Sequence, residues 1–494
     1  MLRSLGYATA LTLAGAFAAV AQPAGTFRQP HDVGFGQASS VDPFSKGKVV
    51  QVVEKIFNRL IRTGLDGKPA PDLAVSWSAN PTATEWTLKL RPGVSFHDGH
   101  PFTAADVVYT LNRAMDPKLD TPVRAAVKSI KTVEALDPLT IKLTLTDPFA
   151  DLPLTLTDYR LVMIPEGSGE TIATTGNGTG PFRVEKFDAQ GTSVLVANPG
   201  YFDGAPKVAR VEVIGIPDAQ ARFQALLGGQ VDMLPGLSRQ EIALISRSPK
   251  HQLQQIPTGN WRGIVFRADV KPFDDVRVRR ALRMAVDRTA MRDLVVGADG
   301  GTTGCDTPVG PTDQYRWDGQ CKQDIAGAKA LLAEAGFANG IDIEMQVATI
   351  EPIWPTIAQV YQQQVAPAGI RVKINQVPND GYWSNIWMKK DVTLTRWSDR
   401  PADSALSEIY TPASPWDESH FADPKFDAML DTARRELDFD KRRALSQDAQ
   451  KYLSDNASTL VTFHVKLGVG VTSRVKDLDA VENFTIRWNR VRVD

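Results

Sequence analysis

The stretch EWTLKLRPGVSFHDGHPFTAADVVYTLNRAMDP, residues 85–117, joins a strand, two turns and a helix without interruption. Apolar side chains alternate with polar ones at its start, at Trp86, Leu88 and Leu90, which predicts a strand with one buried face. Turn signals follow at 91–93 (Arg-Pro-Gly) and 97–99 (His-Asp-Gly), because proline fixes φ and glycine permits positive φ. We therefore expect the chain to reverse direction twice after the strand.

The end of the same stretch predicts a helix that begins after Thr103. Thr103 and Asp106 resemble a capping box, with Asp in place of the usual Glu, in which each side chain reaches the backbone N–H of the other residue. Apolar residues then recur at helical spacing, at Val107, Val108, Leu111 and Ala114.

This succession closely resembles the signature of the large extracytoplasmic solute-binding proteins of peptide-type ABC transporters. That family, often called family 5, includes oligopeptide-, dipeptide- and nickel-binding proteins. Further segments resemble it in the same chain order: VDP at 41–43, PDLA at 71–74 with Trp77, GTGPF at 178–182 with NPGYF at 198–202, GQVD at 229–232, VRRAL at 278–282 with Asp287-Arg288, and 328–336. Each segment is short, but their common order over about 300 positions is specific.

The resemblance implies an α/β fold of the periplasmic binding protein type (type II-like), with two lobes, a hinge and a solute enclosed between the lobes. Lobe I would comprise residues 22–258, with an inserted subdomain at about 45–170, and lobe II residues 259–469; residues 470–494 would return to lobe I. Periodicity predicts helices at 220–228, 275–291, 325–335 and 426–436, and strands at 193–197, 209–216, 341–348 and 370–376.

Residues 1–21 have the pattern of a cleavable signal peptide. Arg3 precedes an apolar run, and Ala19-Val20-Ala21 matches an A-x-A cleavage site before Gln22. Because no cysteine lies near this site, we expect no lipid anchor and a periplasmic mature protein. The formal net charge of −1 provides no basic field for nucleic acid.

The two cysteines, Cys305 and Cys321, bracket a loop rich in Gly, Pro and Asp. In an oxidising compartment we expect them to form a local disulfide. A metal site or a catalytic thiol would need partner residues that the sequence does not place nearby.

Three other patterns bear on catalysis and cofactor binding. GNGTG at 176–180 precedes the strand-like PFRV, whereas a phosphate loop precedes a helix, so a tight turn near the cleft is the better interpretation. His97 and His100 have metal-like spacing but lie in a turn, which favours a histidine bonded to backbone groups. The motifs GxSxG, HExxH and the P-loop do not occur. We expect no enzymatic activity, no metal and no cofactor.

The segment TRWSDRPAD, residues 395–403, resembles the part of the family that lines the cleft, where an indole packs on the solute and an aspartate often pairs with its amine. The resemblance implies that Trp397 is the stacking wall and that Asp399 or Asp403 is the ammonium partner. Arg400 departs from the commoner acidic or small residue. It could bind a carboxylate, or it could neutralise Asp399 or Asp403 and remove the amine site. A solvated loop with one buried Trp is the alternative for the segment.

Other candidate contacts surround this segment. Aromatic side chains precede it at Tyr382, Trp383 and Trp387, and Asn260, Trp261 and Arg262 mark the expected start of lobe II. Aromatic residues with isolated polar groups suit a closed pocket for an organic solute. Any of these residues could equally belong to the core.

These observations predict the periplasmic receptor of an ABC importer, which captures a di- or oligopeptide or a peptide-like solute and delivers it to a membrane permease. ATP hydrolysis would belong to partner ATPase subunits, and the receptor is expected to be a monomer. The same fold could instead hold an opine, a sugar or a metal chelate. A secreted peptide or amide hydrolase is a further alternative.

Overall fold

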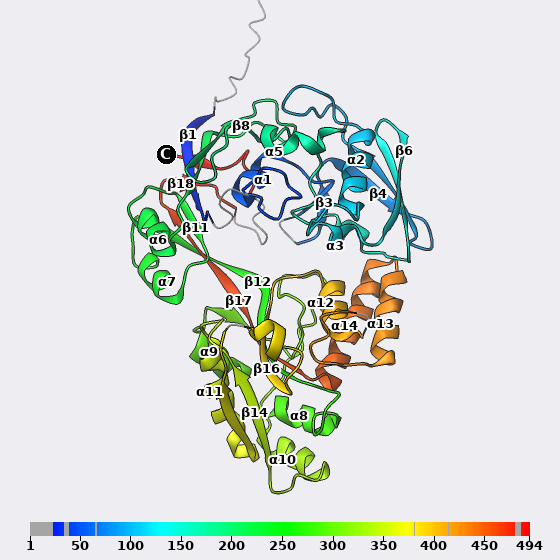
Figure 1. The fold of residues 1–494 in the computed structure, drawn as a ribbon, viewed down its shortest axis with the longest axis vertical. Helices are drawn as coiled ribbons and strands as arrows, with labels where there is room; N and C mark the ends of the chain where they lie inside the picture. Colours follow the sequence, from blue (N-terminus) through cyan, green and yellow to red (C-terminus); the bar gives the residue numbers. More distant parts are fainter. Residues whose placement is uncertain (1–22, 34–38, 65–66, 380, 413, 480–485) are drawn as a thin grey trace, which may run out of the picture.

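The computed structural model describes residues 23–33, 39–64, 67–379, 381–412, 414–479 and 486–494. Two bodies of mixed helix and sheet lie one above the other, joined by the long strands β12 (His251–Phe266) and β17 (Thr459–Thr472) (Figure 1). We call the upper body lobe I and the lower body lobe II. The expected signal peptide lies outside the described residues. Within the described ranges, every helix is too short or too polar to cross a membrane.

Lobe I contains two four-stranded sheets. The first has the order β1-β10-β9-β8, with β1 parallel to β10; the second, β4-β5-β7-β6, is antiparallel and packs against α2. Their strands are β1 (Ala24–His31), β10 (Val208–Gly215), β9 (Thr192–Ala197), β8 (Phe182–Lys186), β4 (Ala74–Ala79), β5 (Glu85–Leu90), β7 (Thr140–Leu145) and β6 (Ile130–Asp137). Its α-helices are α1 (Val50–Ile56), α2 (Ala104–Met115), α3 (Arg124–Val127), α4 (Leu152–Thr155), α5 (Ile172–Thr175), α6 (Ala219–Leu227) and α7 (Arg239–Ile245), and a separate short pair of strands is formed by β2 (Ile61–Thr63) and β3 (Pro69–Pro71).

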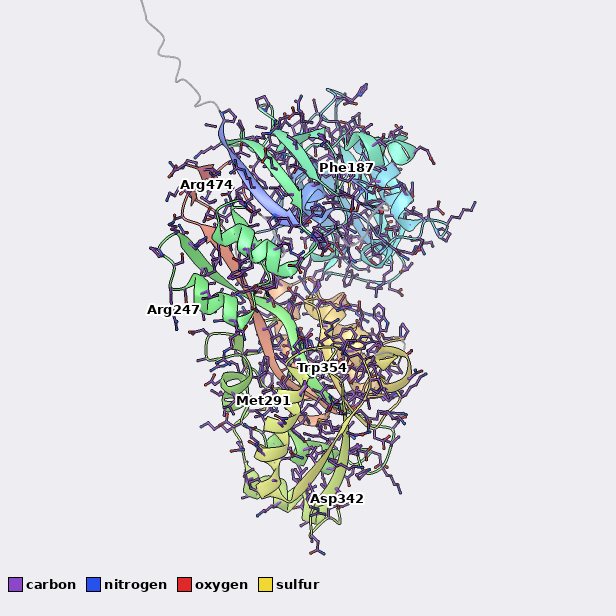
Figure 2. The ribbon with its side chains drawn as sticks, turned by 60° about the vertical axis from the view of Figure 1, so that its left-hand side comes forward. Phe187, Arg247, Met291, Asp342, Trp354 and Arg474 are labelled. Carbon is purple, nitrogen blue, oxygen red and sulfur yellow. A yellow bond between two sulfur atoms is a disulfide. The ribbon has the colours of Figure 1, made fainter. Side chains whose placement is uncertain are left out.

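Lobe II is built on the sheet that β12 and β17 enter from above. Its order is β11-β17-β12-β16-β14-β15, and β13 also pairs with β17. The added strands are β11 (Met233–Pro235), β13 (Gly301–Thr302), β14 (Ile341–Val347), β15 (Ile370–Gln376) and β16 (Val392–Trp397). The helices are α8 (Val276–Met284), α9 (Arg288–Val295), α10 (Ile325–Glu334), α11 (Trp354–Val365), α12 (Ala402–Tyr410), α13 (Pro424–Arg435) and α14 (Phe439–Asn456). Figure 2 places Met291 and Trp354 within this lobe and Asp342 at its far end.

The crossing strands contribute to the cores of both lobes. Val469 of β17 belongs to the lobe I core with Phe27, whereas Ile264 of β12 belongs to the main core of lobe II. Between these regions the register of the pair shifts, from Pro257 to Trp261. A change of backbone angles at this shift would reorient one lobe relative to the other, as hinges do.

The chain returns to lobe I after β17. Trp488, which is 4% exposed, packs edge-on against Phe27 at 5.1 Å and Phe182 at 5.3 Å. Two short strands, β18 (Val475–Lys476) and β19 (Arg492–Val493), pair in the same segment. Arg474, labelled in Figure 2, forms an ion pair with the fully buried Asp232, with Nε 2.8 Å from a carboxylate oxygen.

The stretch at residues 85–117 folds as expected. β5 buries Trp86, Leu88 and Leu90, and α2 begins after Thr103, whose capping box with Asp106 is complete. Elsewhere the structure confirms the predicted strands and three of the four predicted helices, to within two residues at each end.

The prediction of one continuous helix at 275–291 is wrong. α8 ends at Met284, and α9 begins at Arg288 because the Asp287 side chain accepts the N–H of Ala290 at 2.9 Å and caps a new helix. The apolar residues of both helices nevertheless lie in one core, since Met291 of α9 packs in the same cluster as Val278 and Leu282 of α8. Apolar spacing alone did not distinguish one helix from two helices that share a buried face.

The expected disulfide is present. Cys305 and Cys321 are bonded, with their Cα atoms 4.9 Å apart. It closes a loop next to α14, where Cys305 is buried and lies 2.8 Å from the hydroxyl of Ser454.

The turn at 176–180 packs tightly against α1, and β8 follows it as expected. A Cβ on Gly178 would lie 1.8 Å from the carbonyl oxygen of Ile56, so only glycine fits there. His97 accepts the N–H of Gly178 on Nδ1 at 3.3 Å and donates from Nε2 to the carbonyl of Gly180 at 3.0 Å. Burial lowers the pKa of His97 to about 4. His97 is therefore bonded to backbone groups through both ring nitrogens.

Candidate ligand-binding site

Trp397 lies at the end of β16, next to the hinge. It is 7% exposed and pairs in register with Trp261 of β12, and the two rings stack with centroids 6.5 Å apart. Trp416, which is 44% exposed, meets the Trp397 ring edge-on at 6.4 Å. We call Trp397, Trp416 and Arg400 the aromatic wall of lobe II.

Arg400 is held on this wall by two kinds of contact. Its guanidinium lies 4.7 Å from the centroid of Trp397 and 5.9 Å from that of Trp416, within the range of a cation–π interaction. Its Nε donates to Glu408 of α12 at 2.8 Å. The planar group is therefore preorganised, and Glu408 is its ion-pair partner.

The two candidate ammonium partners differ in their surroundings. Asp403, in the first turn of α12, is bound by Arg434 at 2.6 Å. Asp399 lies against the hinge strand: its N–H donates to Asn260 Oδ1 at 2.8 Å, and a Cβ on Gly259 would lie 1.8 Å from Asp399 Oδ1. The absence of a side chain at Gly259 therefore makes room for the Asp399 carboxylate.

A buried carboxylate lies behind the wall. Glu418 is 1% exposed and accepts hydrogen bonds from the indole N–H of Trp397 at 2.9 Å, the hydroxyl of Thr395 at 2.7 Å, and the indole N–H of Trp387. Burial raises the pKa of Glu418 to about 7. Glu418 was not predicted from the sequence, because no local pattern connects it with a tryptophan 21 positions earlier.

The other aromatic candidates form a cluster beside the wall. Tyr382 is fully buried, and its hydroxyl donates to the carbonyl of Leu394 at 2.8 Å. Trp383 packs edge-on between Trp354 at 5.8 Å and Trp387 at 5.4 Å. Tyr382 therefore lies in the lobe II core, while Trp383 and Trp387 lie at its edge.

Arg262 lies on β12 but faces another part of lobe II. Its NH2 group donates to Glu351 at 3.2 Å, and Glu351 also accepts from Arg396 at 3.1 Å. The Arg396 guanidinium lies 5.9 Å from the Trp383 ring. Arg262, Glu351 and Arg396 thus form one charged cluster, which contacts the Trp383 ring through Arg396.

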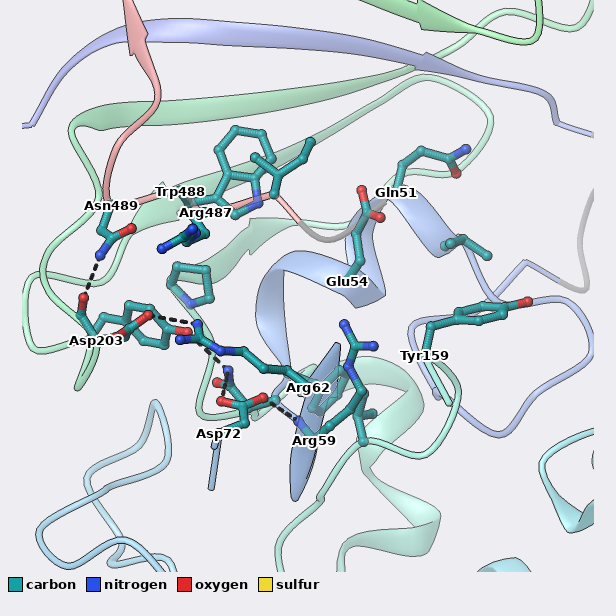
Figure 3. Close-up of a pocket in the computed structure, with 17 residues that line it drawn as sticks. Gln51, Glu54, Arg59, Arg62, Asp72, Tyr159, Asp203, Arg487, Trp488 and Asn489 are labelled. Carbon is teal, nitrogen blue, oxygen red and sulfur yellow. Dashed lines mark hydrogen bonds and ion pairs between the residues drawn. The ribbon is translucent and has the colours of Figure 1, made fainter. Parts of the chain in front are cut away.

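Lobe I contributes a cavity of about 350 Å³, shown in Figure 3. α1, the β2–β3 region, the loop around Tyr159 and the returning C-terminal segment line it. Its charged lining residues balance in sign: Glu54, Asp72, Asp203, Arg59, Arg62 and Arg487. The aromatic rings of Phe57, Tyr159, Tyr201 and Trp488 also line it.

Asp72 organises the base of this cavity (Figure 3). Its carboxylate accepts the N–H of Arg59 and the side-chain amide of Asn58, both at 3.0 Å, and Asn58 also donates to the Tyr201 hydroxyl at 3.0 Å. Burial raises the pKa of Asp72 to about 6. Arg62 pairs with Asp203 at 3.0 Å. Because these contacts join distant segments, sequence patterns did not reveal the cavity.

The rim of the cavity faces lobe II. Tyr159 lines the cavity and is 42% exposed, and Leu154 of the preceding helix α4 packs against the lobe II core beside the wall. Next to Tyr159, the bond from Arg160 to Asp158 raises the pKa of Arg160, and the carboxylate of Glu408 contributes to the same shift. The cavity rim and the aromatic wall are therefore neighbours across the space between the lobes.

A second contact joins the lobes on the side away from β12 and β17, where α13 and α14 lie below lobe I (Figure 1). Asp151 of lobe I accepts the hydroxyl of Tyr315 at 2.6 Å and Nε of Arg442 at 3.0 Å. The N–H of Ala150 donates to the carbonyl of Arg434 at 2.8 Å. Burial raises the pKa of Asp151.

Comparison with known proteins decides the family. The bacterial extracellular solute-binding proteins, family 5 (middle region), match residues 68–416, which is more than half of the chain. The chain belongs to this family. The resemblance drawn from the order of short segments is thereby confirmed.

Relatives of this family 5 protein cover most of its length. Heme-binding protein A of Haemophilus influenzae is 28% identical over 468 residues, covering 86% of this chain and 84% of the relative. Glutathione-binding protein GsiB of Pectobacterium atrosepticum is 28% identical over 437 residues, with 83% and 84% covered. The solved structure of HbpA2 from Haemophilus parasuis has a TM-score of 0.84 at 23% identity, covering 95% of this chain and all of that one. The expected two-lobe α/β fold is confirmed.

Proposed function

We propose that this family 5 protein is the solute receptor of an ABC importer and binds a peptide-like solute between the aromatic wall and the lobe I cavity. The observation that carries the proposal is the position of the wall, with Trp416 exposed and Arg400 preorganised, beside the rim of a charged cavity across the hinge. The name of the glutathione-binding relative supports a solute of this class.

The charges of the site suit a zwitterionic solute. Arg400 would bind a carboxylate, because its guanidinium is fixed by Glu408 and two indoles. Asp399, whose carboxylate lies against Gly259 of the hinge strand and close to the wall, is our candidate for the ammonium partner. The mixed charges of the lobe I cavity would accept the remaining polar groups of the solute. Trp397, which is 7% exposed, would support Arg400 at the base of the wall, and the exposed Trp416 would supply the stacking surface.

Binding would act through closure of the lobes and would involve no covalent step. A solute that contacts both lobes stabilises the closed arrangement by its differential affinity for that arrangement. The permease and its ATPase would then receive the solute from the closed receptor. We further propose that the signal peptide is cleaved after residue 21 and that the mature protein works as a periplasmic monomer.

The test is calorimetric titration of the protein, unfolded and refolded to remove carried-over solute, with reduced glutathione, tripeptides, an opine-like conjugate, hemin and a nickel chelate. Glutathione or a tripeptide should bind and be recovered intact by mass spectrometry. A solute at 100 times its dissociation constant should stabilise the protein by about 2.7 kcal/mol. Binding of hemin or the chelate alone would contradict the peptide-like solute, and cleavage of the peptide would contradict the receptor role.

Two exposed side chains provide a matched pair of variants. Trp416→Ala should weaken binding without lowering the melting temperature of the ligand-free protein, because Trp416 is 44% exposed. Leu294→Ala, at a residue of α9 that is 61% exposed, should change neither quantity. Equal affinities of the two variants would contradict the position of the site.

A further inference from the structure

Glu418 has the contacts of a positioning residue. Its two carboxylate oxygens accept from three side chains: Trp397 bonds Oε1, whereas Thr395 and Trp387 bond Oε2. Trp397 and Trp387 therefore direct their N–H edges to a single buried group. The two rings themselves meet edge-on at 6.4 Å.

The surroundings of Glu418 make it a costly residue for stability alone. The three side-chain donors that the structure gives it, within the described residues, are all neutral. A buried carboxylate without a cationic partner is unfavourable relative to an apolar side chain of similar volume. The contacts that offset this cost also fix the orientation of two indoles.

Trp397 connects Glu418 with the surface of the wall. Its N–H edge meets Glu418 and one ring face meets the guanidinium of Arg400 at 4.7 Å. A hydrogen bond from the N–H to a carboxylate increases the negative charge on the indole ring. Because a cation–π interaction depends on that charge, the same bond strengthens the contact with Arg400. The chain of contacts thus runs from the core to the proposed solute site.

Other ionisable groups near Glu418 belong to three segments. Asp417, the preceding residue, opposes ionisation of Glu418. Tyr382, before β16, and Tyr410, on α12, both respond to the charge of Glu418. Burial and Asp417 together raise the pKa of Glu418 to about 7, so Glu418 changes charge near neutral pH.

We propose that Glu418 is the positioning residue of the aromatic wall: it fixes the Trp397 indole and, through that indole, the guanidinium of Arg400. Its effect on solute affinity rests on the proposed function, whereas its effect on the indoles does not. When Glu418 takes up a proton, Trp397 and Trp387 lose a charged acceptor, and the hold on Arg400 weakens. Solute affinity should therefore fall as the pH is lowered through about 7.

Fluorine NMR of ligand-free protein labelled with 5-fluorotryptophan tests the positional role. The chain has 10 tryptophans, and spectra of Trp387→Phe and Trp397→Phe assign the two resonances of interest. In the wild type these two should shift together between pH 5 and 9 with one midpoint near 7. Both resonances remaining constant over this range would overturn the proposal, and this measurement needs no substitution at Glu418.

Two substitutions sharpen the test. In Glu418→Gln both resonances should be displaced and should no longer titrate; a titration unchanged from the wild type would overturn the proposal. Asp417→Asn is the matched control, and it should keep the joint titration with a lower midpoint, because a neighbouring negative charge is removed.

Calorimetry with reduced glutathione as the probe tests the effect on binding. At pH 8, Glu418→Gln should bind about tenfold more weakly than the wild type, since a charged acceptor becomes a neutral one. The wild type should lose a similar factor between pH 8 and 6, and the variant should not. Equal affinities and pH profiles would overturn the link to binding. If the wild type does not bind glutathione, the peptide-like solute is contradicted, while the fluorine titration still decides the positional role.

Discussion

Replacement of Arg442 by Met should open the contact between the lobes. The side chains of Arg442 and Asp151 are only 11% and 15% exposed, and Asp151 would lose its cationic partner. Removing one partner of a fully buried ion pair costs about 3–5 kcal/mol. Because Tyr315 still donates to Asp151 and water reaches part of the pair, we expect about 2 kcal/mol. This corresponds to about a 30-fold shift in the equilibrium between closed and open lobes.

Small-angle X-ray scattering of the ligand-free protein measures this shift as a larger radius of gyration. Glutathione affinity should fall as well, because the binding-competent arrangement becomes a smaller fraction of the population. Arg443→Met, at the exposed neighbouring residue, is the control. Adding Asp151→Ala to Arg442→Met should reverse part of the shift, since it removes the buried carboxylate that Arg442→Met leaves without a cationic partner. Unchanged scattering and affinity in Arg442→Met would refute the reasoning.

Three further predictions concern single residues. Arg400→Ala should weaken glutathione binding by about 1.5–3 kcal/mol in calorimetry. The control Arg371→Ala, which breaks an exposed ion pair with Asp342, should leave affinity unchanged. Equal affinities of the two variants would contradict a carboxylate contact at Arg400. Gly259→Ala should displace Asp399, because the new Cβ would lie 1.8 Å from its carboxylate, and glutathione affinity should therefore fall. The control Gly229→Ala, at an open turn, should leave affinity unchanged. Burial lowers the pKa of His464 to about 3, so the contribution of neutral His464 to stability is complete above pH 6.5 and is lost as the pH falls toward the folded-state pKa. Between pH 6.5 and 4.5 the wild type should therefore lose about 2 kcal/mol more unfolding free energy than His464→Gln. Parallel pH dependences in urea denaturation would contradict this.

The sequence predicted those parts of the fold whose signals are local. The strand at Trp86 and the cap at Thr103 each depend on residues within a few positions, and both are confirmed. The crossing strand β12 was not predicted, because Pro257 and Gly259 interrupt its pattern where its register also shifts. A hinge needs this irregular backbone, so the segment most important for closure gave the weakest strand signal.

In the candidate site, too, local sequence signals were predictive and long-range contacts were not. Trp397 was identified because the letters around it resemble a family segment, but the resemblance supplied residue types and no contacts. The resemblance left open whether Arg400 neutralises Asp399 or Asp403. In the structure Arg400 pairs instead with Glu408, on the helix that follows it. Asp403, one of the two acids that Arg400 could have neutralised, is instead bound by Arg434, 31 positions away. Charge pairing depends on which helix faces lie together, and short motifs do not contain that information.

Glu418 shows why a buried acid is the hardest of these residues to find. In the sequence it follows Pro, Trp and Asp in a segment that has the composition of an exposed loop. In the structure it is 1% exposed, and its donors come from β16 and from the turn that precedes that strand. Its carboxylate suggests a surface position in the sequence, but in the structure the same carboxylate accepts the N–H groups of two indoles. Composition indicates whether a side chain is polar, but only packing determines whether that polarity faces water or orients the wall of a site.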